Sequence, residues 1–529
     1  QNKSGPETII GELKRPISSY EVSAAVKKLK NNRASGPDGI PGELLKYGST
    51  SLFVEIAKIL NQKIEKNEEL ELGLGTLIVL PKPGKPAGLM SSLRPIVLLN
   101  TLRKILSTIT LFRIRYTIEK FLSPSRSGFR PNRSTTDAVW AHKWLIARIM
   151  KMKELIHILG IDLSRAFDTI DRNLLLKEMK TIVDEDSWRM THTLLNNTTL
   201  QARIKNILSE PFETNIGVPQ GDALSPVLFT IYLELALREL RKAIPKPLED
   251  EHLPSEIEYA DDTDFISSEI EYLNKIKTDA PKILEKWCLA MNSDKTELTT
   301  IRRETNKKEE TWRNTKKLGT LLGDVEEMQR RKQLATIAQK NMWVIWRKNS
   351  NKISLQKRIM LYNAYIVPIL TYNACTWALT KAETNELDAF HRKQLRSILG
   401  IRYPNTITNE KLYENCKSNK LSETIRDSRW RMLGHVLRMA DDIPAKRTMI
   451  QYFREKTTCF RGTPRTTLPI IINKELEEIN EKAKELATEL KLPTQLKTIQ
   501  DLKALETIAQ QRMKWRYLMT NMHVLEQKS

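Results

Sequence analysis

The hydrophobic residues of the chain follow two different periods, and together these periods predict a mixed fold. Nearly continuous apolar runs at residues 76–80, 94–99 and 155–162 predict strands, the last of them buried on both faces. Apolar residues spaced by three and four positions predict helices. The helices are expected near residues 101–122, 135–152, 171–197, 227–240 and 270–287, with two further strands at 201–208 and 213–217.

Beyond residue 326 the apolar spacing is helical almost throughout. Helices are expected at residues 326–348 and 355–370, followed by a helical core that continues to Ile398. In the tail, one helix is expected through residues 421–436. A stripe on a long amphipathic helix then packs internally or joins a partner. The stripe consists of Ile472, Leu476, Ile479, Ala483, Leu486 and Leu490.

Two adjacent acids, Asp261 and Asp262, lie between apolar runs in the stretch 258–265. Apolar residues alternate with polar ones before the acids and follow again after them, which predicts a strand, a tight turn and a second strand. Two ionised carboxylates in one turn raise each other's pKa, and divalent cations bound between them would reverse this cost. A metal site and a solvated Asp-Asp turn both fit this stretch.

Asp162 ends the buried apolar run 155–162, where a carboxylate is costly unless it has a partner. The elements between Asp162 and the hairpin suit a sheet on which Asp162, Asp261 and Asp262 converge. Three such carboxylates would hold two Mg²⁺ ions, with Mn²⁺ as the alternative ion. Two ions of this kind activate a 3′-hydroxyl and stabilise a leaving pyrophosphate. Asp168 and Asp171 are instead suited to cap the next helix, the capping interpretation being favoured for Asp168.

Basic and polar loop residues accompany these acids. Lys82 follows the first apolar run and Arg94 begins the second, so a hairpin would bring them together as a cradle for a triphosphate. A solvated basic loop fits the same residues. Gln220 and Gly221 lie in a Pro-Gln-Gly loop before an apolar helix, where backbone donors and one amide face an approaching ligand.

The chain of 529 residues has a formal net charge of +22 and a pI near 9.6, which favours a folded polyanion binder of several domains. Charge alone does not distinguish nucleic acid from an anionic membrane, but no apolar run reaches the roughly 18 residues of a spanning helix. The four cysteines form no Cys-x-x-Cys pair, so neither a zinc module nor a disulfide framework is expected. The chain begins with Gln1 and no apolar leader, so no secretory signal is expected and the sequence is expected to be a fragment.

Six segments in a fixed order carry a resemblance to the reverse transcriptase domain of non-LTR, LINE-type retrotransposons. They are Gly36-Pro37-Asp38-Gly39, Leu93-Arg94-Pro95-Ile96, the stretch 162–168, the stretch 217–226, the stretch 259–262 and the stretch 292–296. The segments 318–324 and 430–439 match as well, so the resemblance covers most of the chain. One departure is Asp222, where many relatives carry serine, and another is Asp294 beside Lys295.

The resemblance implies a role for each candidate residue. Asp162, Asp261 and Asp262 would be the catalytic acids and metal ligands, and Lys295 a proton donor to pyrophosphate. Lys82 and Arg94 would hold the incoming triphosphate, and Gln220 and Gly221 would lie beside the template and the nucleotide. Phe167 would lie beneath the nucleotide sugar, where a ring leaves no room for a 2′-hydroxyl; packing in the core is the alternative for this side chain.

The same resemblance implies an α+β right-hand polymerase, with fingers, a palm built on an antiparallel sheet and a helical thumb, followed by a mostly helical C-terminal region. The expected divisions are residues 1–70 for the N-terminal extension and start of the fingers, 71–300 for fingers and palm, 301–400 for the end of the palm and the thumb, and 401–529 for a basic helical tail. The expected activity is that of an RNA-directed DNA polymerase, and the alternative is an inactive RNA-binding remnant.

The partners implied are template RNA, a DNA primer or target and dNTPs, with no membrane. The location implied is intracellular and nuclear. Relatives usually encode an endonuclease as well, and no convincing nuclease residues are recognised here, so nicking activity is expected to be missing. The sequence leaves the oligomeric state open.

Overall fold

The computed structural model describes residues 10–68, 74–82, 84, 86, 88–152, 154–196, 198–205, 207–348, 352–454 and 464–522. The chain forms two compact units, each assembled from separate segments. The first unit comprises residues 1–123, 161–245 and 274–296, and the second comprises 124–160, 246–273 and 297–529. Among the described helices, none has the length and apolar character needed to cross a membrane.

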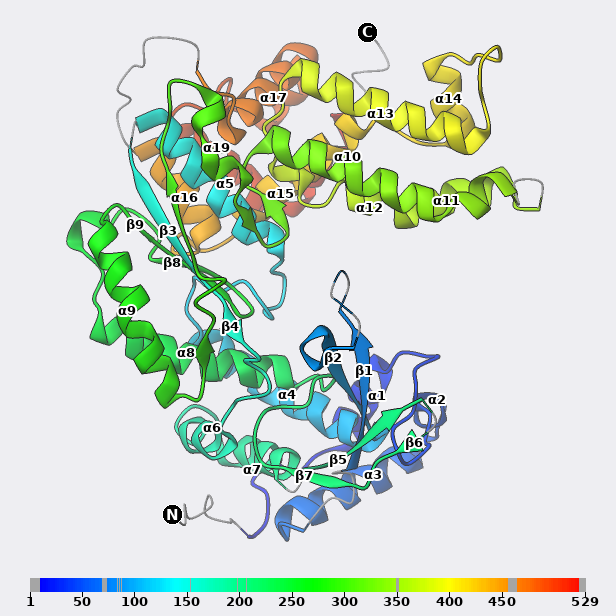
Figure 1. Ribbon diagram of the computed structural model, residues 1–529, viewed down its shortest axis with the longest axis vertical. Helices are drawn as coiled ribbons and strands as arrows, with labels where there is room; N and C mark the ends of the chain where they lie inside the picture. The colour runs from blue at the N-terminus through cyan, green and yellow to red at the C-terminus, as the bar shows by residue number, and fades with distance from the viewer. Residues whose placement is uncertain are drawn as a thin grey trace. The chain divides into compact units, whose positions relative to one another are not determined.

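The first unit contains a sheet with strand order β2-β1-β5-β6, in which β7 also pairs with β5 (Figure 1). β1 runs antiparallel to β2 and parallel to β5. A small second sheet pairs β4 with β10. The strands are β1 (Leu74–Pro81), β2 (Leu93–Leu99), β4 (Leu163–Ser164), β5 (Thr198–Ile204), β6 (Ile207–Leu208), β7 (Phe212–Thr214) and β10 (Ala290–Met291).

The helices of the first unit pack around these strands. They are α1 (Ser19–Lys28), α2 (Gly42–Lys46), α3 (Thr50–Glu65), α4 (Thr101–Phe121), α6 (Arg172–Met179), α7 (Glu185–Leu195) and α8 (Ser225–Ala243). Helix α9 (Ile270–Lys286) begins in the second unit and continues in the first. Most of α8 is buried because its apolar residues surround the helix on more than one side.

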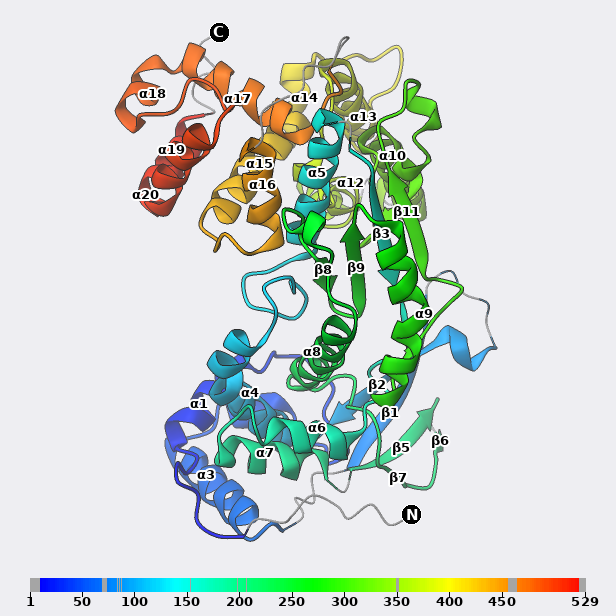
Figure 2. The ribbon, with the colours of Figure 1, turned by 90° about the vertical axis from the view of Figure 1, so that its left-hand side faces the viewer.

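The second unit contains a four-stranded sheet with order β11-β3-β9-β8 and a two-stranded sheet of β12 (Lys316–Lys317) and β13 (Thr320–Leu321). β8 (Glu256–Tyr259) and β9 (Asp262–Ser267) form an antiparallel hairpin, and β11 (Glu297–Ile301) pairs antiparallel with β3 (Ile156–Ile161). β3 and β9 are neighbours that run in opposite directions (Figure 2). β3 is central and its first four residues are buried, as its continuous apolar run predicts.

The rest of the second unit is mostly helical and is built around α5 (Thr135–Met152), which is buried along almost its whole length. Trp140 and Trp144 of α5 share one hydrophobic core with the C-terminal helices. These helices are α15 (Leu421–Leu437), α16 (Pro444–Arg454), α17 (Leu468–Lys482), α18 (Lys484–Leu490), α19 (Ile499–Gln510) and α20 (Arg512–Asn521).

A second core joins the helices that precede them, namely α10 (Asp324–Asn341), α11 (Leu355–Tyr365), α12 (Val367–Leu370), α13 (Lys381–Leu399) and α14 (Asn409–Cys416). The apolar stripe from Ile472 to Leu490 is buried in the first of these cores. The sequence left open whether this stripe packs internally or joins a partner, and the structure shows that it packs internally. The α+β fold with an antiparallel sheet and a mostly helical C-terminal part is confirmed, whereas the four predicted divisions of the chain stay a prediction.

Three predicted elements are shorter than expected because local backbone chemistry interrupts them. The helix expected at 171–197 is two helices, since the Asp184 side chain accepts a hydrogen bond from the Ser187 N–H and starts α7. The strand expected at 201–208 turns back at Lys205, whose φ is +57°, so that β6 pairs with β5. The long tail helix breaks at Ala483, where φ is −124° and ψ is 49°. The sequence also predicts a basic turn at Arg461-Gly462-Thr463-Pro464-Arg465, whose first three residues lie outside the described residues.

Candidate active site

The hairpin that carries the paired acids has a two-residue turn. Tyr259 pairs with Asp262, which leaves Ala260 and Asp261 as the turn residues. Ala260 has φ +56°, a left-handed conformation that is uncommon for a residue with a Cβ. Such strained residues persist only where surrounding contacts hold them. The prediction of a strand, a tight turn and a second strand is confirmed here.

Those contacts come from the segment just before α5. The Ser127 N–H donates to the Glu258 carbonyl over 2.8 Å, and the Glu258 N–H donates to the Ser125 carbonyl over 3.0 Å. Arg126 forms a fully buried ion pair with Glu258 and donates from Nη1 to the Ala260 carbonyl over 3.0 Å. The segment therefore holds both the edge of β8 and the turn itself.

Gly128 brings this segment into direct backbone contact with the turn. A Cβ at Gly128 would lie 2.0 Å from the Ala260 nitrogen and 2.8 Å from the Tyr259 carbonyl carbon. Both neighbours are main-chain atoms, which cannot move aside as the end of a flexible side chain can. Position 128 therefore requires glycine for close approach rather than for an unusual φ.

A second buried charge network supports the hairpin two residues after Asp262. Asp264 lies 2.5 Å from Lys317 Nζ and 3.0 Å from His142 Nε2. Burial alone would raise the pKa of Asp264, but Lys317 and His142 lower it to about 2. Gly160 of β3 leaves room for this network, because a Cβ there would lie 2.4 Å from Lys317 Nζ. Asp264 is therefore paired with Lys317 and His142 inside the fold, and its role is structural.

Asp162 directly follows β3 and belongs to the first unit, as does Lys295. The Asn292 N–H donates to the Asp162 carbonyl over 2.8 Å, and Lys295 Nζ lies 3.0 Å from Asp162 Oδ2. Because both side chains are partly exposed to solvent, this ion pair is weak and can be exchanged for other partners. The structure therefore brings together two of the predicted catalytic residues.

Of the two predicted capping acids, only Asp171 caps a helix. Asp171 accepts hydrogen bonds from the Asn173 and Leu174 N–H groups at the start of α6. Asp168 instead accepts a hydrogen bond of 3.0 Å from Gln220 Nε2, so the capping interpretation was wrong for this residue. The reason is tertiary: the Pro-Gln-Gly loop lies against the turn that carries Asp168, and it offers an amide donor there.

That loop is fixed on its other side by β2. The Val97 N–H donates to the Gln220 carbonyl over 2.7 Å. Gly221 has φ +125°, and a Cβ there would lie 2.7 Å from the Val97 carbonyl oxygen. Phe167 stacks on Phe229 with a centroid distance of 4.4 Å and remains partly exposed. Its ring thus packs on one side, as the core alternative requires, without being fully enclosed.

Lys82 and Arg94 lie on the β1–β2 hairpin, as predicted. Leu80 pairs with Arg94, and the Lys82 N–H donates to the Ser92 carbonyl over 2.8 Å. Since side chains alternate along a strand, Lys82 and Arg94 are diagonal neighbours on one face. The Arg94 side chain is exposed and the Lys82 side chain is half-buried.

Arg172 is a buried arginine that the sequence did not single out, and it holds several loops of the first unit. Arg172 donates to the main-chain carbonyls of Gly217, Leu195, Thr214 and Ile216. Burial, with Arg103 nearby, lowers the pKa of Arg172 to about 10. No periodicity or turn signal distinguishes such a residue, because its partners are main-chain atoms from distant parts of the chain.

Asp222, the departure noted in the sequence, is a buried structural acid. It lies 3.6 Å from Arg103 Nε and accepts a hydrogen bond of 2.9 Å from Ser107 Oγ. Burial lowers the pKa of Arg103, and the Asp222 carboxylate opposes that shift. An aspartate at position 222 is therefore paired with a residue of opposite charge, Arg103 of α4.

The candidate residues thus form two groups. Asp162, Lys295, Lys82, Arg94, Phe167, Gln220 and Gly221 belong to the first unit, whereas Asp261 and Asp262 belong to the second. Within the described part of the chain, no three His, Cys, Asp or Glu side chains gather closely enough to hold a metal ion. The donors available are nevertheless carboxylate oxygens, which are the ligands that Mg²⁺ prefers, and Asp264 is not among them because it is buried and paired.

The chain is similar in sequence to several known polymerases. Residues 80–334 match the reverse transcriptase (RNA-dependent DNA polymerase) family. The chain is 25% identical over 221 residues to a probable RNA-directed DNA polymerase from transposon BS of Drosophila melanogaster, covering 41% of this chain and 24% of that protein. It is 23% identical over 417 residues to the corresponding X-element protein of the same species, covering 73% and 44%.

The jockey polymerase of Drosophila funebris is 22% identical over 420 residues, covering 73% of this chain and 44% of that protein. The chain therefore spans between 24% and 44% of the lengths of these relatives. Among solved structures, the telomerase of Candida albicans in complex with a fragment of telomeric RNA matches with a TM-score of 0.35 and 13% identity, covering 74% of this chain and 67% of that one.

Residues 80–334 of this chain are therefore similar to a reverse transcriptase domain. Its distant homologues are the RNA-directed DNA polymerases of non-LTR retrotransposons. The resemblance drawn from the ordered sequence segments is confirmed.

Proposed function

We propose that this chain is an RNA-directed DNA polymerase that extends a DNA 3′-hydroxyl on an RNA template by two-metal nucleotidyl transfer. One observation carries the proposal. Within a reverse transcriptase domain, β3 ends one residue before Asp162, and its neighbour in the sheet, β9, begins at Asp262. The predicted acids therefore follow or begin adjacent strands of one sheet.

Asp162, Asp261 and Asp262 would hold the ions. Bound there, two divalent ions supply charge stabilisation for the attacking and leaving oxygens of an in-line displacement. The clamp formed by Arg126 and Gly128 fixes the backbone from which Asp261 projects. Lys295, which pairs with Asp162 before substrate binds, has a mobile ammonium that can donate a proton to the leaving pyrophosphate.

The remaining first-unit residues select the nucleotide in this proposal. Lys82 and Arg94 present two cations on one face of a hairpin, and such a pair suits a triphosphate. Phe167, held by its stack on Phe229, would exclude a 2′-hydroxyl from the sugar position. Gln220 keeps its amide on Asp168, which orients the loop toward the same turn. The nuclear location implied by the resemblance remains a prediction.

The test is extension of a DNA primer on an RNA template with dNTPs and Mg²⁺. The full chain should extend the primer, and Asp261→Ala should abolish extension. Asp442→Ala, which removes an exposed acid outside the proposed site, is the matched control and should extend at the rate of the unmodified protein. Extension that survives Asp261→Ala would exclude this site, and an unmodified chain that binds RNA but never extends a primer would favour the inactive remnant.

A further inference from the structure

Helices α15 and α20 cross in the second unit and carry a cluster of exposed or half-buried arginines around their contact. Gly434 of α15 lies under the ring of Trp515 of α20, since a Cβ there would be 2.2 Å from Trp515 Nε1. The same Nε1 donates to the Trp430 carbonyl over 3.2 Å. Both tryptophans are buried, so the contact between α15 and α20 is part of the core.

The arginine cluster comprises Arg431, Arg438, Arg512 and Arg516. Arg431 and Arg438 lie about one turn before and one turn after Gly434. Arg512 lies about one turn before Trp515, and Arg516 directly follows it. Arg438 donates from Nη1 to the Ala509 carbonyl over 3.1 Å. Burial lowers the pKa of Arg438, and the positive charge of Arg512 lowers it further.

No described acid neutralises this arginine cluster by an ion pair. Residues 510–522 contain three basic residues and no acid. Arg512 also lies in the first turn of α20, where the helix dipole disfavours a cation. Neighbouring like charges repel one another, and a polyanionic ligand would relieve that repulsion.

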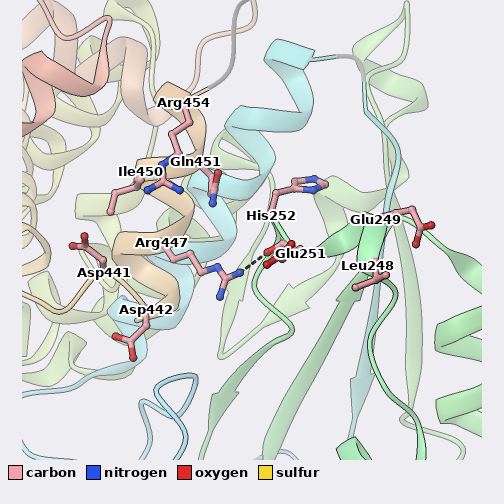
Figure 3. A pocket seen from close by; sticks show the side chains of 10 residues that line it. All are labelled: Leu248, Glu249, Glu251, His252, Asp441, Asp442, Arg447, Ile450, Gln451 and Arg454. Carbon is pink, nitrogen blue, oxygen red and sulfur yellow. Dashed lines mark hydrogen bonds between the residues drawn. The ribbon is translucent and has the colours of Figure 1, made fainter.

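Asp441 and Asp442, the two acids that follow α15 in the chain, line a groove that does not include the arginine cluster. The groove has a volume of about 630 Å³ and is also lined by Arg447 (Figure 3). Asp441 Oδ1 lies 2.8 Å from Lys446 Nζ, and Arg447 donates to the Glu251 carbonyl. The groove carries charges of both signs. Beside the arginine cluster one acid, Glu489, accepts a hydrogen bond of 3.4 Å from the Tyr517 hydroxyl.

Apolar and aromatic side chains accompany the arginines on the solvent face of α20. Met513 is 73% exposed and Tyr517 is 46% exposed, while Trp515 and Leu518 on the other face are buried. Arg512, Met513, Arg516 and Tyr517 share one face because they are spaced by one and four residues. Cations interleaved with an exposed ring suit a single-stranded nucleic acid, whose phosphates pair with arginine and whose unpaired bases stack on aromatic side chains.

We propose that the arginine cluster and Tyr517 bind a single-stranded segment of RNA outside the polymerase site. The choice of RNA over DNA rests on the proposed function, in which the unpaired strand is the template RNA. The surface needs neither dNTPs nor the hairpin acids, because all its residues lie on α15 and α20.

The test measures binding of a labelled, unstructured single-stranded RNA to the full chain by fluorescence anisotropy at several salt concentrations, without dNTPs. The double variant Arg512→Gln/Arg516→Gln should weaken binding, and it should reduce the slope of log K against log salt by about 1.4, since each single-strand phosphate contact contributes about 0.7. Lys482→Gln/Lys484→Gln removes the same charge from exposed positions on α17 and α18 and should leave both quantities unchanged. An equal loss in both double variants would overturn the proposal.

Tyr517→Ala separates base stacking from charge. It should weaken RNA binding roughly tenfold, the effect of losing one stacked base, while leaving binding of a duplex DNA of equal length unchanged. Unchanged RNA binding by Tyr517→Ala would overturn the single-strand assignment. Loss of binding to phosphatidylserine vesicles by the arginine variant, with RNA binding intact, would assign the surface to membrane instead.

The same measurements distinguish this proposal from the polymerase proposal. Asp261→Ala should bind RNA as the unmodified chain does, because the hairpin is not part of the surface. If primer extension fails but the arginine variant loses RNA affinity, the arginine cluster stands and the polymerase does not. If extension succeeds while the arginine variant binds RNA with an unchanged salt slope, only the arginine cluster fails.

Discussion

Gly128→Ala tests whether backbone contact with the turn positions the acids of the hairpin. The new Cβ would start 2.0 Å from the Ala260 nitrogen, whereas ordinary contacts begin near 3.4 Å, so the turn must shift by about 1.4 Å. A misplacement of about 1 Å at a reacting centre can lower a rate roughly 100-fold, equivalent to about 2.7 kcal/mol in the activation free energy. We expect the rate of nucleotide incorporation to fall by about this factor.

The assay is single-turnover extension of a DNA primer annealed to RNA, with template binding and thermal unfolding measured in parallel. Binding should be unchanged, because the atoms nearest to a Cβ at Gly128 belong to Tyr259 and Ala260 of the hairpin. Gly42→Ala is the matched control, because the atom nearest to its Cβ would be Leu29 Cδ1 at 3.6 Å, an ordinary van der Waals contact. An incorporation rate for Gly128→Ala within twofold of the unmodified chain, at an unchanged unfolding temperature, would refute the reasoning.

Three further outcomes are expected. Arg172→Leu leaves several buried carbonyls without a donor and should lower the free energy of unfolding by about 3–5 kcal/mol, measured by urea denaturation. His391 is 1% exposed, and burial lowers its pKa to about 4. As the pH falls, His391 is protonated in the unfolded chain before it is protonated in the folded chain, so the free energy of unfolding should fall by about 3 kcal/mol between pH 6.5 and pH 4. In urea titrations at these two pH values, His391→Phe should remove most of that loss, and an unchanged pH dependence would contradict the prediction. Phe167→Ala should admit ribonucleotides in competition with dNTPs, and undiminished discrimination would count against a steric role.

The predicted hairpin and the strand before Asp162 were correct because both depend on local signals. Alternating apolar residues around a two-residue turn, and an unbroken apolar run, are properties of neighbouring residues in the chain. The errors occurred where local signals were weak. The polar stretch 171–197 keeps helical spacing across its break, and only the bond from the Asp184 side chain shows where the second helix begins.

Asp168 illustrates a different limit. Its position after a turn made it a plausible helix cap by sequence, and Asp171 three residues later occupied that role. What decided the outcome was Gln220, 52 residues away, whose amide reaches Asp168 Oδ1. This hydrogen bond forms because the loop packs on β2. Rules based on the spacing of residues along the chain do not describe such packing.

The resemblance to reverse transcriptases, the order of the acidic and basic segments, and the hairpin that presents Asp261 and Asp262 all follow from the amino-acid sequence alone. These depend on composition and short-range periodicity, which each segment carries alone. The contacts that hold that hairpin in place are visible only once the chain is folded. Arg126 pairs with Glu258 over 132 positions, and Gly128 is needed because another backbone lies against it. Such requirements arise when distant segments pack together and therefore leave no periodic trace in the chain.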